Sequence, residues 1–152
     1  KLSYLGEELL LETLPSIIDG SNDRVPQDLN LVTYAFNLKR DEEKINWDLS
    51  VKQIDAHLRA FSPEPGLYTE IDGKQLKVFA LEMHQCKNFE KHHGNDENGT
   101  IVKIFDDAIG VKCSNGVIKL KEVQLSGKKR QDVKTFLNGA GRNLISTLKK
   151  FK

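Results

Sequence analysis

Cysteine, methionine and long apolar segments are all scarce in this sequence of 152 residues. No apolar run approaches the roughly 20 residues that a membrane-spanning helix needs, so we expect no membrane contact. Two cysteines, Cys86 and Cys113, are too few for a disulfide framework, and we expect both thiols to be reduced in a cytoplasmic protein. The chain opens at Lys1 and its only methionine is Met83, which leads us to expect a piece of a longer protein.

Catalytic and metal-binding patterns are also lacking. No serine or cysteine stands in a tight glycine turn, and no glycine-rich loop follows a predicted strand, so we predict no catalytic residue. The one group with metal-ligating chemistry has an irregular spacing, unlike the paired ligands of zinc sites, and consists of His84, Cys86, His92 and His93. We therefore predict no metal site.

Basic side chains gather at the C-terminal end, although the net charge of the chain is only +1. Residues 1–48 contain 5 basic and 10 acidic side chains, and residues 49–118 contain 8 and 10. Residues 119–152 contain 10 and 2, a net charge of +8. Such a basic end is typical of a surface that binds a polyanion, but a solvated basic segment explains the charge equally well.

The first 48 residues predict a helix followed by a linker. Leu2, Leu5 and Leu9 recur at helical spacing, and Asp19-Gly20 supplies the stop. This helix is too isolated to form a core, so its apolar stripe needs another surface. Residues 21–48 are polar and lack a sustained period, which predicts a linker anchored locally by its apolar side chains, namely Tyr34, Phe36, Leu38, Ile45 and Trp47.

Residues 49–152 predict a small, mainly β domain. Ser50 and Gln53 form a capping box at the start of a helix that ends before Pro63. A second, short helix is capped by Asp132 and ends at Gly139. Five alternating segments predict strands, with tight turns at residues 72–73 and 115–116, and they cover residues 67–71, 75–83, 100–105, 109–114 and 117–125. This density of short strands indicates a barrel or a sandwich.

A candidate RNA-binding surface lies in the last of these strands and in the turn after it. Lys119 and Lys121 alternate with Ile118 and Leu120, so both lysines should point to solvent. The turn Gly127-Lys128-Lys129-Arg130 adds three positive charges, and such a cluster can neutralise several phosphates. No aromatic residue interleaves with it, which favours contact with the backbone of a folded RNA over base stacking. The alternative is an edge strand kept soluble by lysine.

Lys39 and Arg40 form a smaller basic site in the predicted linker. An acidic run at residues 41–43 follows directly and could simply start a helical turn, because negative charge stabilises a helix N-terminus.

Five short motifs follow one another in a fixed order: Pro26-Gln27-Asp28, Thr33-Tyr34-Ala35, Ile45-Asn46-Trp47, the segment Arg59–Gly66, and Gly127-Lys128-Lys129-Arg130. In this order and spacing they resemble the C-terminal third of the bacterial methionyl-tRNA formyltransferase family, over nearly the whole chain. The sequence departs from the family at Ser62 and Glu64, where members usually read Asn-Pro-Trp-Pro, and at Gln131, where methionine commonly follows the basic triplet.

The resemblance implies an OB-like barrel at residues 49–152, preceded by a linker at 21–48 and by a helix at 1–20 left from a Rossmann-like catalytic domain. In the family that domain transfers a formyl group from 10-formyltetrahydrofolate to the amino group of initiator methionyl-tRNA in translation initiation. Its catalytic Asn, His and Asp have no counterpart here, so we expect this chain alone to bind no cofactor. The implied partners of a monomeric chain are initiator methionyl-tRNA and the missing catalytic domain. The residues expected to contact RNA are Lys119, Lys121, Lys128, Lys129 and Arg130, with Lys39 and Arg40 as further candidates.

Two alternatives remain open. The domain could belong to another formyltransferase or to a formyl-folate hydrolase, or it could be a standalone basic RNA-binding module. The Thr-Tyr-Ala segment and the Gly-Lys-Lys-Arg turn favour the tRNA enzyme.

Overall fold

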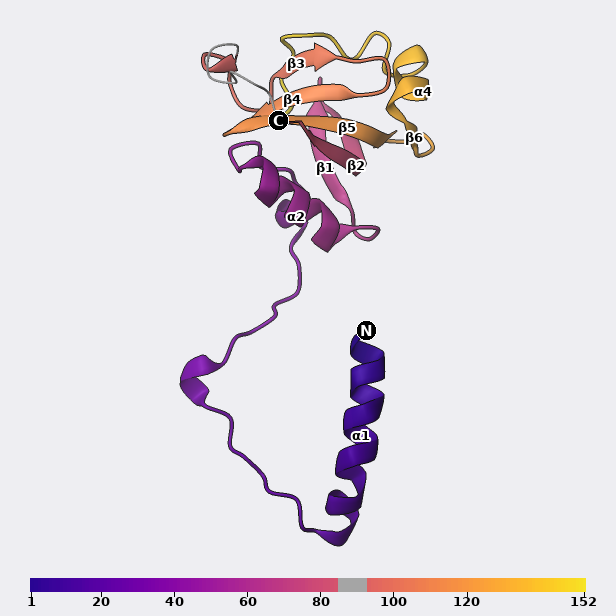
Figure 1. Cartoon of the computed structure of the whole chain (residues 1–152). Coiled ribbons are helices and arrows are strands. Elements are labelled where there is room, and N and C mark those ends of the chain that lie inside the picture. Colours follow the sequence, from indigo (N-terminus) through magenta and orange to yellow (C-terminus); the bar gives the residue numbers. More distant parts are fainter. Residues whose placement is uncertain (85–92) are drawn as a thin grey trace. The chain divides into compact units, whose positions relative to one another are not determined.

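The computed structural model describes residues 1–84 and 93–152. These residues form two compact units, Lys1–Asn37 and Leu38–Lys152, which are described separately (Figure 1). Within the described ranges, no helix is both long and apolar enough to cross a membrane.

The first unit contains helix α1 (Leu2–Asp19) and a short 3-10 helix, η1 (Leu29–Leu31). The helix α1 ends where predicted, because Gly20 adopts a left-handed conformation with φ of 75°. None of its residues is buried, and Leu2 and Ile18 are 85% and 77% exposed. The apolar stripe of α1 therefore has no partner among the described residues of this unit.

The predicted linker at residues 21–48 divides between the two units. Tyr34 and Phe36 stack on each other with ring centroids 6.0 Å apart, yet both remain exposed and are not part of a buried core among the described residues. In contrast, Ile45 and Trp47 are buried in the second unit. The Ile45 amide donates to the Tyr68 carbonyl at 2.8 Å, which ties this end of the segment to the sheet.

Helix α2 (Val51–Phe61) confirms the predicted capping box. The Gln53 amide donates to Ser50 Oγ, and the Gln53 side chain accepts from the Ser50 amide at 3.0 Å. One face of α2 buries Ile54, Leu58 and Phe61 against the sheet. The helix ends before Pro63, as predicted.

The predicted strands form one antiparallel sheet in the order β1-β2-β5-β4-β3, with a sixth strand, β6, paired to β5. Their bounds are β1 Leu67–Ile71, β2 Lys74–His84, β3 Ile101–Ile104, β4 Ile109–Cys113, β5 Gly116–Leu125 and β6 Gln131–Asp132. Helix α4 (Val133–Asn138) follows directly, and the Asp132 carboxylate accepts from the Thr135 amide at 2.8 Å. The second predicted helix is therefore also confirmed.

The sheet is not a closed barrel, which corrects the predicted barrel architecture. Strands β1 and β3 are the two ends of the pairing order, and neither pairs with the other. Instead, residues 148–152 bond to both edges. The Ile101 amide donates to the Lys149 carbonyl at 2.8 Å, and the Phe151 amide donates to the Gly99 carbonyl at 2.9 Å. On the other side, Glu70 and Lys152 exchange two backbone hydrogen bonds of 3.1 and 2.9 Å.

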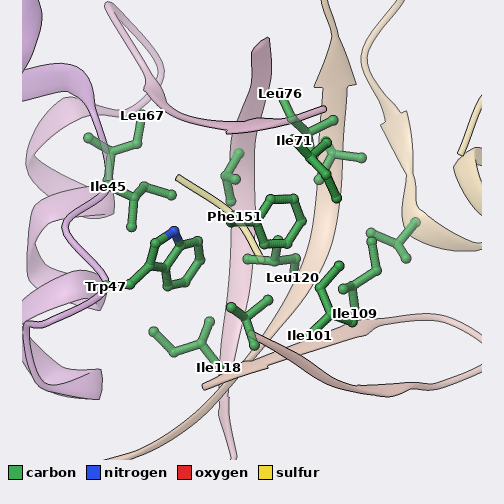
Figure 2. Close-up of a cluster of buried hydrophobic side chains, with 14 of the residues drawn as sticks. Ile45, Trp47, Leu67, Ile71, Leu76, Ile101, Ile109, Ile118, Leu120 and Phe151 are labelled. Carbon is green, nitrogen blue, oxygen red and sulfur yellow. The ribbon is translucent and has the colours of Figure 1, made fainter. Parts of the chain in front are cut away.

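The core lies between the curled sheet, α2 and this C-terminal tail (Figure 2). Trp47 and Phe151 stack at its centre, and the Trp47 indole donates to Thr69 Oγ1 at 3.1 Å. The Thr69 hydroxyl in turn donates to the Lys152 carbonyl at 3.1 Å. Gly99 passes close by with φ of +86°, and a Cβ there would come within 2.7 Å of the Phe151 carbonyl oxygen. The tail is thus an integral part of the domain.

Candidate nucleic-acid interface

Two paired bulges determine how β5 presents its charged side chains. Val78 pairs with Val123, Ala80 with Glu122 and Leu81 with Leu120, so Phe79 on β2 and Lys121 on β5 are left without a partner. A bulge bends the strand and redirects side chains. The sequence carries a signal of this, because the buried apolar positions of β5 change from Ile118 and Leu120 to Val123 and Leu125. A strict alternation of buried and exposed residues along the strand does not predict these bulges.

Lys119 and Lys121 lie outside the buried core, but their side chains are only 19% and 32% exposed and both are ion-paired. Lys121 Nζ bonds to the Asp107 carboxylate and lies 3.9 Å from Glu82 Oε2. Lys119 Nζ lies 3.8 Å from Glu82 Oε1. The bond with Lys121 lowers the pKa of Asp107, and the same bond raises the pKa of Lys121. Two carboxylates therefore already compete for the lysines of this strand.

An aromatic ring lies among these lysines, contrary to the expectation that the cluster has none. Lys103, Gly110 and Lys119 are aligned across β3, β4 and β5. The Phe105 ring folds over Gly110, where an added Cβ would meet the ring at 3.1 Å. The Nζ atoms of Lys103 and Lys119 lie 4.8 and 4.7 Å from the ring centroid, a cation–π arrangement. The sequence does not point to Phe105 as part of this cluster, because Phe105 follows β3 and is distant in sequence from the lysines of β5.

Lys128 and Lys129 form the most accessible part of the predicted surface. Gly127 adopts φ of 74°, and the Lys128 amide donates to the Leu125 carbonyl at 2.9 Å, which fixes the turn. Both lysine side chains are exposed. No ion pair within residues 1–84 and 93–152 involves either of them, so their charges are available to a ligand.

Arg130 lies beside these lysines but is held by the protein. Its Nε and Nη2 donate to the two oxygens of Glu122 at 2.7 and 2.5 Å. Its guanidinium carbon also lies 4.3 Å from the centroid of the bulged Phe79 ring. The bidentate bond lowers the pKa of Glu122, and the bond to Glu122 raises the pKa of Arg130. Arg130 is therefore oriented in advance and partly neutralised.

Lys39 and Arg40 lie at a second place on the same unit. Arg40 begins the 3-10 helix η2 (Arg40–Glu43), and the Lys39 amide donates to the Glu42 carboxylate at 2.6 Å. The acidic run thus starts a helical turn, as the alternative interpretation stated. Within the described part of the chain, no hydrogen bond or ion pair links these two residues to the β5 lysines or to the turn.

Only two of the four side chains with metal-ligating chemistry, His84 and His93, lie in the described residues, and no cluster of three or more metal-ligating side chains occurs there. The ring of His84 lies against Phe105 with centroids 6.0 Å apart, and His93 Nδ1 lies 3.0 Å from Asp96 Oδ2. Cys86 and His92 lie outside the described residues. Cys113 is a free, buried thiol, and burial raises its pKa to about 11, which makes it a poor nucleophile.

Comparison with known proteins places the chain in a family. Residues 37–141 match the family described as formyl transferase, C-terminal domain. The chain belongs to this family. It is 41% identical over 146 residues to the methionyl-tRNA formyltransferase of Staphylococcus epidermidis, which covers 95% of the chain and 45% of the relative. It is 44% identical over 147 residues to the enzyme of the same name from Dictyoglomus turgidum, again with 95% and 45% covered. The chain thus spans about half the length of these relatives.

Solved structures support the fold of this formyl transferase C-terminal domain. A variant of HypX from Aquifex aeolicus has a TM-score of 0.61 over 91% of the chain and 24% of its own length, with 14% sequence identity. HypX in complex with tetrahydrofolic acid has a TM-score of 0.58 over 95% of the chain and 26% of its own length, with 13% identity. At such low identity the likeness concerns the fold alone.

Proposed function

We propose that this chain is the tRNA-binding C-terminal part of a methionyl-tRNA formyltransferase. The intact enzyme would transfer a formyl group from 10-formyltetrahydrofolate to the amino group of initiator methionyl-tRNA, in the cytoplasm, during translation initiation. The observation that carries the proposal is the match of 95% of the chain to 45% of relatives that bear this name.

Helix α1, whose apolar stripe has no partner within its own unit, supports the same proposal. An amphipathic helix of 18 residues without one buried side chain needs a further surface to cover its apolar stripe. We assign that surface to a Rossmann-like catalytic domain, with residues 1–20 as its last helix and 21–48 as the linker. The open antiparallel sheet, with its two edges bridged by residues 148–152, is in this proposal the C-terminal domain at residues 49–152.

The proposed RNA contact is centred on Lys128 and Lys129. These two side chains are exposed and unpaired among the described residues, whereas Lys119, Lys121 and Arg130 each face a carboxylate. Phosphates of the RNA would engage the turn lysines first and then compete with Asp107, Glu82 and Glu122 for the other three cations. Lys39 and Arg40 would form a separate, secondary contact.

A titration of the chain with initiator tRNA at several salt concentrations tests this proposal. Binding through a few phosphates should be weak, with a Kd of about 10⁻⁴–10⁻⁶ M at physiological salt. Replacing Lys128 and Lys129 together by alanine should weaken binding and reduce the slope of log affinity against log salt by about two. The control variant Lys52→Ala/Lys74→Ala removes two exposed lysines from α2 and from the start of β2, with the same change in net charge. Equal effects of the two double variants would contradict a contact at the turn.

A further inference from the structure

A small polar pocket lies on the exposed face of the sheet, next to the turn that carries Lys128 and Lys129. It is lined by Gln75 and Lys77 of β2 and by Gln124 and Ser126 at the end of β5. Lys77 and Gln124 are directly opposite each other in the strand register. The Ser126 amide donates to the Gln75 carbonyl at 3.0 Å, so the second pair also lies side by side.

Two of these four side chains have no hydrogen-bond partner in the described part of the chain. Lys77 Nζ donates to the Pro65 carbonyl at 2.8 Å, and Gln124 Nε2 donates to the Lys128 carbonyl at 2.8 Å. Within residues 1–84 and 93–152, no hydrogen bond involves the side-chain amide of Gln75 or the hydroxyl of Ser126. Each of these groups can both donate and accept, and the Gln124 carbonyl oxygen can accept.

The pocket is joined to the phosphate-binding turn through backbone geometry. The bond from Gln124 to the Lys128 carbonyl holds the backbone of the first turn lysine beside the pocket. In the proposed complex, a nucleic-acid strand whose phosphates contact Lys128 and Lys129 would have its sugars beside the amides and the hydroxyl. The sugar group that can donate and accept a hydrogen bond is the ribose 2′-hydroxyl, which DNA lacks.

We propose that Gln75 and Gln124, with Ser126, bind ribose 2′-hydroxyls of an RNA strand and so enable this surface to distinguish RNA from DNA. The inference rests on the proposed function, since it needs phosphates on the turn lysines. It assigns different roles in RNA binding to the turn lysines and to the pocket. The lysines supply affinity that depends on salt, and the pocket supplies discrimination that does not. The lining contains no aromatic ring on which a base could stack, so the sugar is the group that the pocket addresses.

The test compares three hairpins of one sequence: RNA, RNA with 2′-fluoro sugars, and DNA. The 2′-fluoro hairpin keeps the A-form helix and removes only the hydroxyl, which separates hydrogen bonding from helix shape. The chain should bind the RNA hairpin about 3- to 10-fold more tightly than the 2′-fluoro hairpin, as expected for one or two net hydrogen bonds. Gln75→Ala should remove most of this preference and leave the salt slope unchanged.

Gln75→Ala is the decisive variant because the bond from Gln124 to the Lys128 carbonyl remains, so the turn keeps its support. Gln27→Ala, an exposed glutamine of the other unit, is the matched control and should keep the full preference. Equal affinity of the parent chain for RNA and 2′-fluoro RNA would overturn the inference, as would an unchanged preference in Gln75→Ala. Both results leave phosphate binding intact. Failure of the proposed function looks different, because no hairpin would then bind even at low salt.

Discussion

Trp47 and Phe151 stack with ring centroids 5.9 Å apart and an interplanar angle of 23°, which joins the segment before α2 to the C-terminal tail. The Trp47 indole and the Lys152 carbonyl also meet through the Thr69 hydroxyl. Residues 148–152 also bond to both edges of the sheet, so the contact packs the same segment that covers these edges. The tail therefore acts as the element that completes an otherwise open sheet.

Phe151→Ala should destabilise the domain by about 3–5 kcal/mol, because it empties a fully buried site next to Trp47. Phe151 is only 1% exposed. The chain contains one tryptophan, so its fluorescence during denaturant unfolding reports directly on this contact. Leu148→Ala is the control in the same tail, since Leu148 is 79% exposed and should tolerate the change within about 0.5 kcal/mol. Similar midpoints for both variants would mean that the tail is not docked.

The local elements were predictable because their signals are local. The Ser50–Gln53 capping box, the turn at Asp72-Gly73 and the Asp132 cap depend on residues three or fewer positions apart. The role of the tail was not predictable, because residues 148–152 have no strand period and their partners, Gly99, Ile101 and Glu70, are distant in sequence.

The same difference between local signals and partners distant in sequence applies to the candidate site. Outward-pointing lysines on β5 follow from alternation, and the exposed turn follows from Gly127. Their partners do not, since Glu82, Asp107, Phe79 and Phe105 come from other strands and turns. A charge count therefore identifies where cations gather, and only the tertiary structure distinguishes the paired cations from the accessible ones.

The ion pair of Asp107 and Lys121 predicts a specific loss of stability in acid. The bond lowers the pKa of Asp107 below its ordinary value of 3.8 in the folded state. A lowered carboxylate pKa stabilises the folded state above that ordinary value, and the contribution is lost as pH falls through the lowered pKa. Asp107→Asn should therefore unfold at a lower temperature than the parent at neutral pH. The two should converge in acid below pH 3.8.

Melting curves over this range provide the measurement. Asp106→Asn is the neighbouring control, because Asp106 forms no ion pair in the described structure, and its melting temperature should follow that of the parent at neutral pH. Because the pair is exposed to solvent, salt should also reduce the difference between the parent and Asp107→Asn. A difference that persists unchanged in acid would show that the carboxylate charge is not responsible.

The chain by itself should not transfer a formyl group. Under the proposed function, the catalytic Asn, His and Asp belong to the catalytic domain and have no counterpart in this sequence, and Cys113 is buried with a raised pKa. Incubation of the purified chain with charged initiator tRNA and 10-formyltetrahydrofolate should give no formyl-methionine. The full-length enzyme of the proposed function should give turnover under the same conditions. Turnover by the chain alone would place a catalytic site within it and contradict the proposed division of roles.

Glu122→Gln should strengthen binding to tRNA, because it frees Arg130 from its own carboxylate. The two bonds of 2.7 and 2.5 Å now direct both donors of the guanidinium to Glu122, and an RNA phosphate must compete with them. Glutamine keeps the size of the side chain and removes its charge, while Phe79 still supports the guanidinium. We expect the affinity to rise about 3- to 10-fold, and the salt dependence to steepen by about one unit, as one more phosphate is neutralised.

Glu97→Gln separates this local effect from a change in net charge. It also raises the net charge of the chain by one and frees one lysine, Lys150, but it does so beside the C-terminal tail. If Arg130 contacts RNA, only Glu122→Gln changes the salt slope, and adding Arg130→Ala to it abolishes the gain. If both glutamate variants strengthen binding equally, the effect comes from the overall charge, and Arg130 does not contact the RNA.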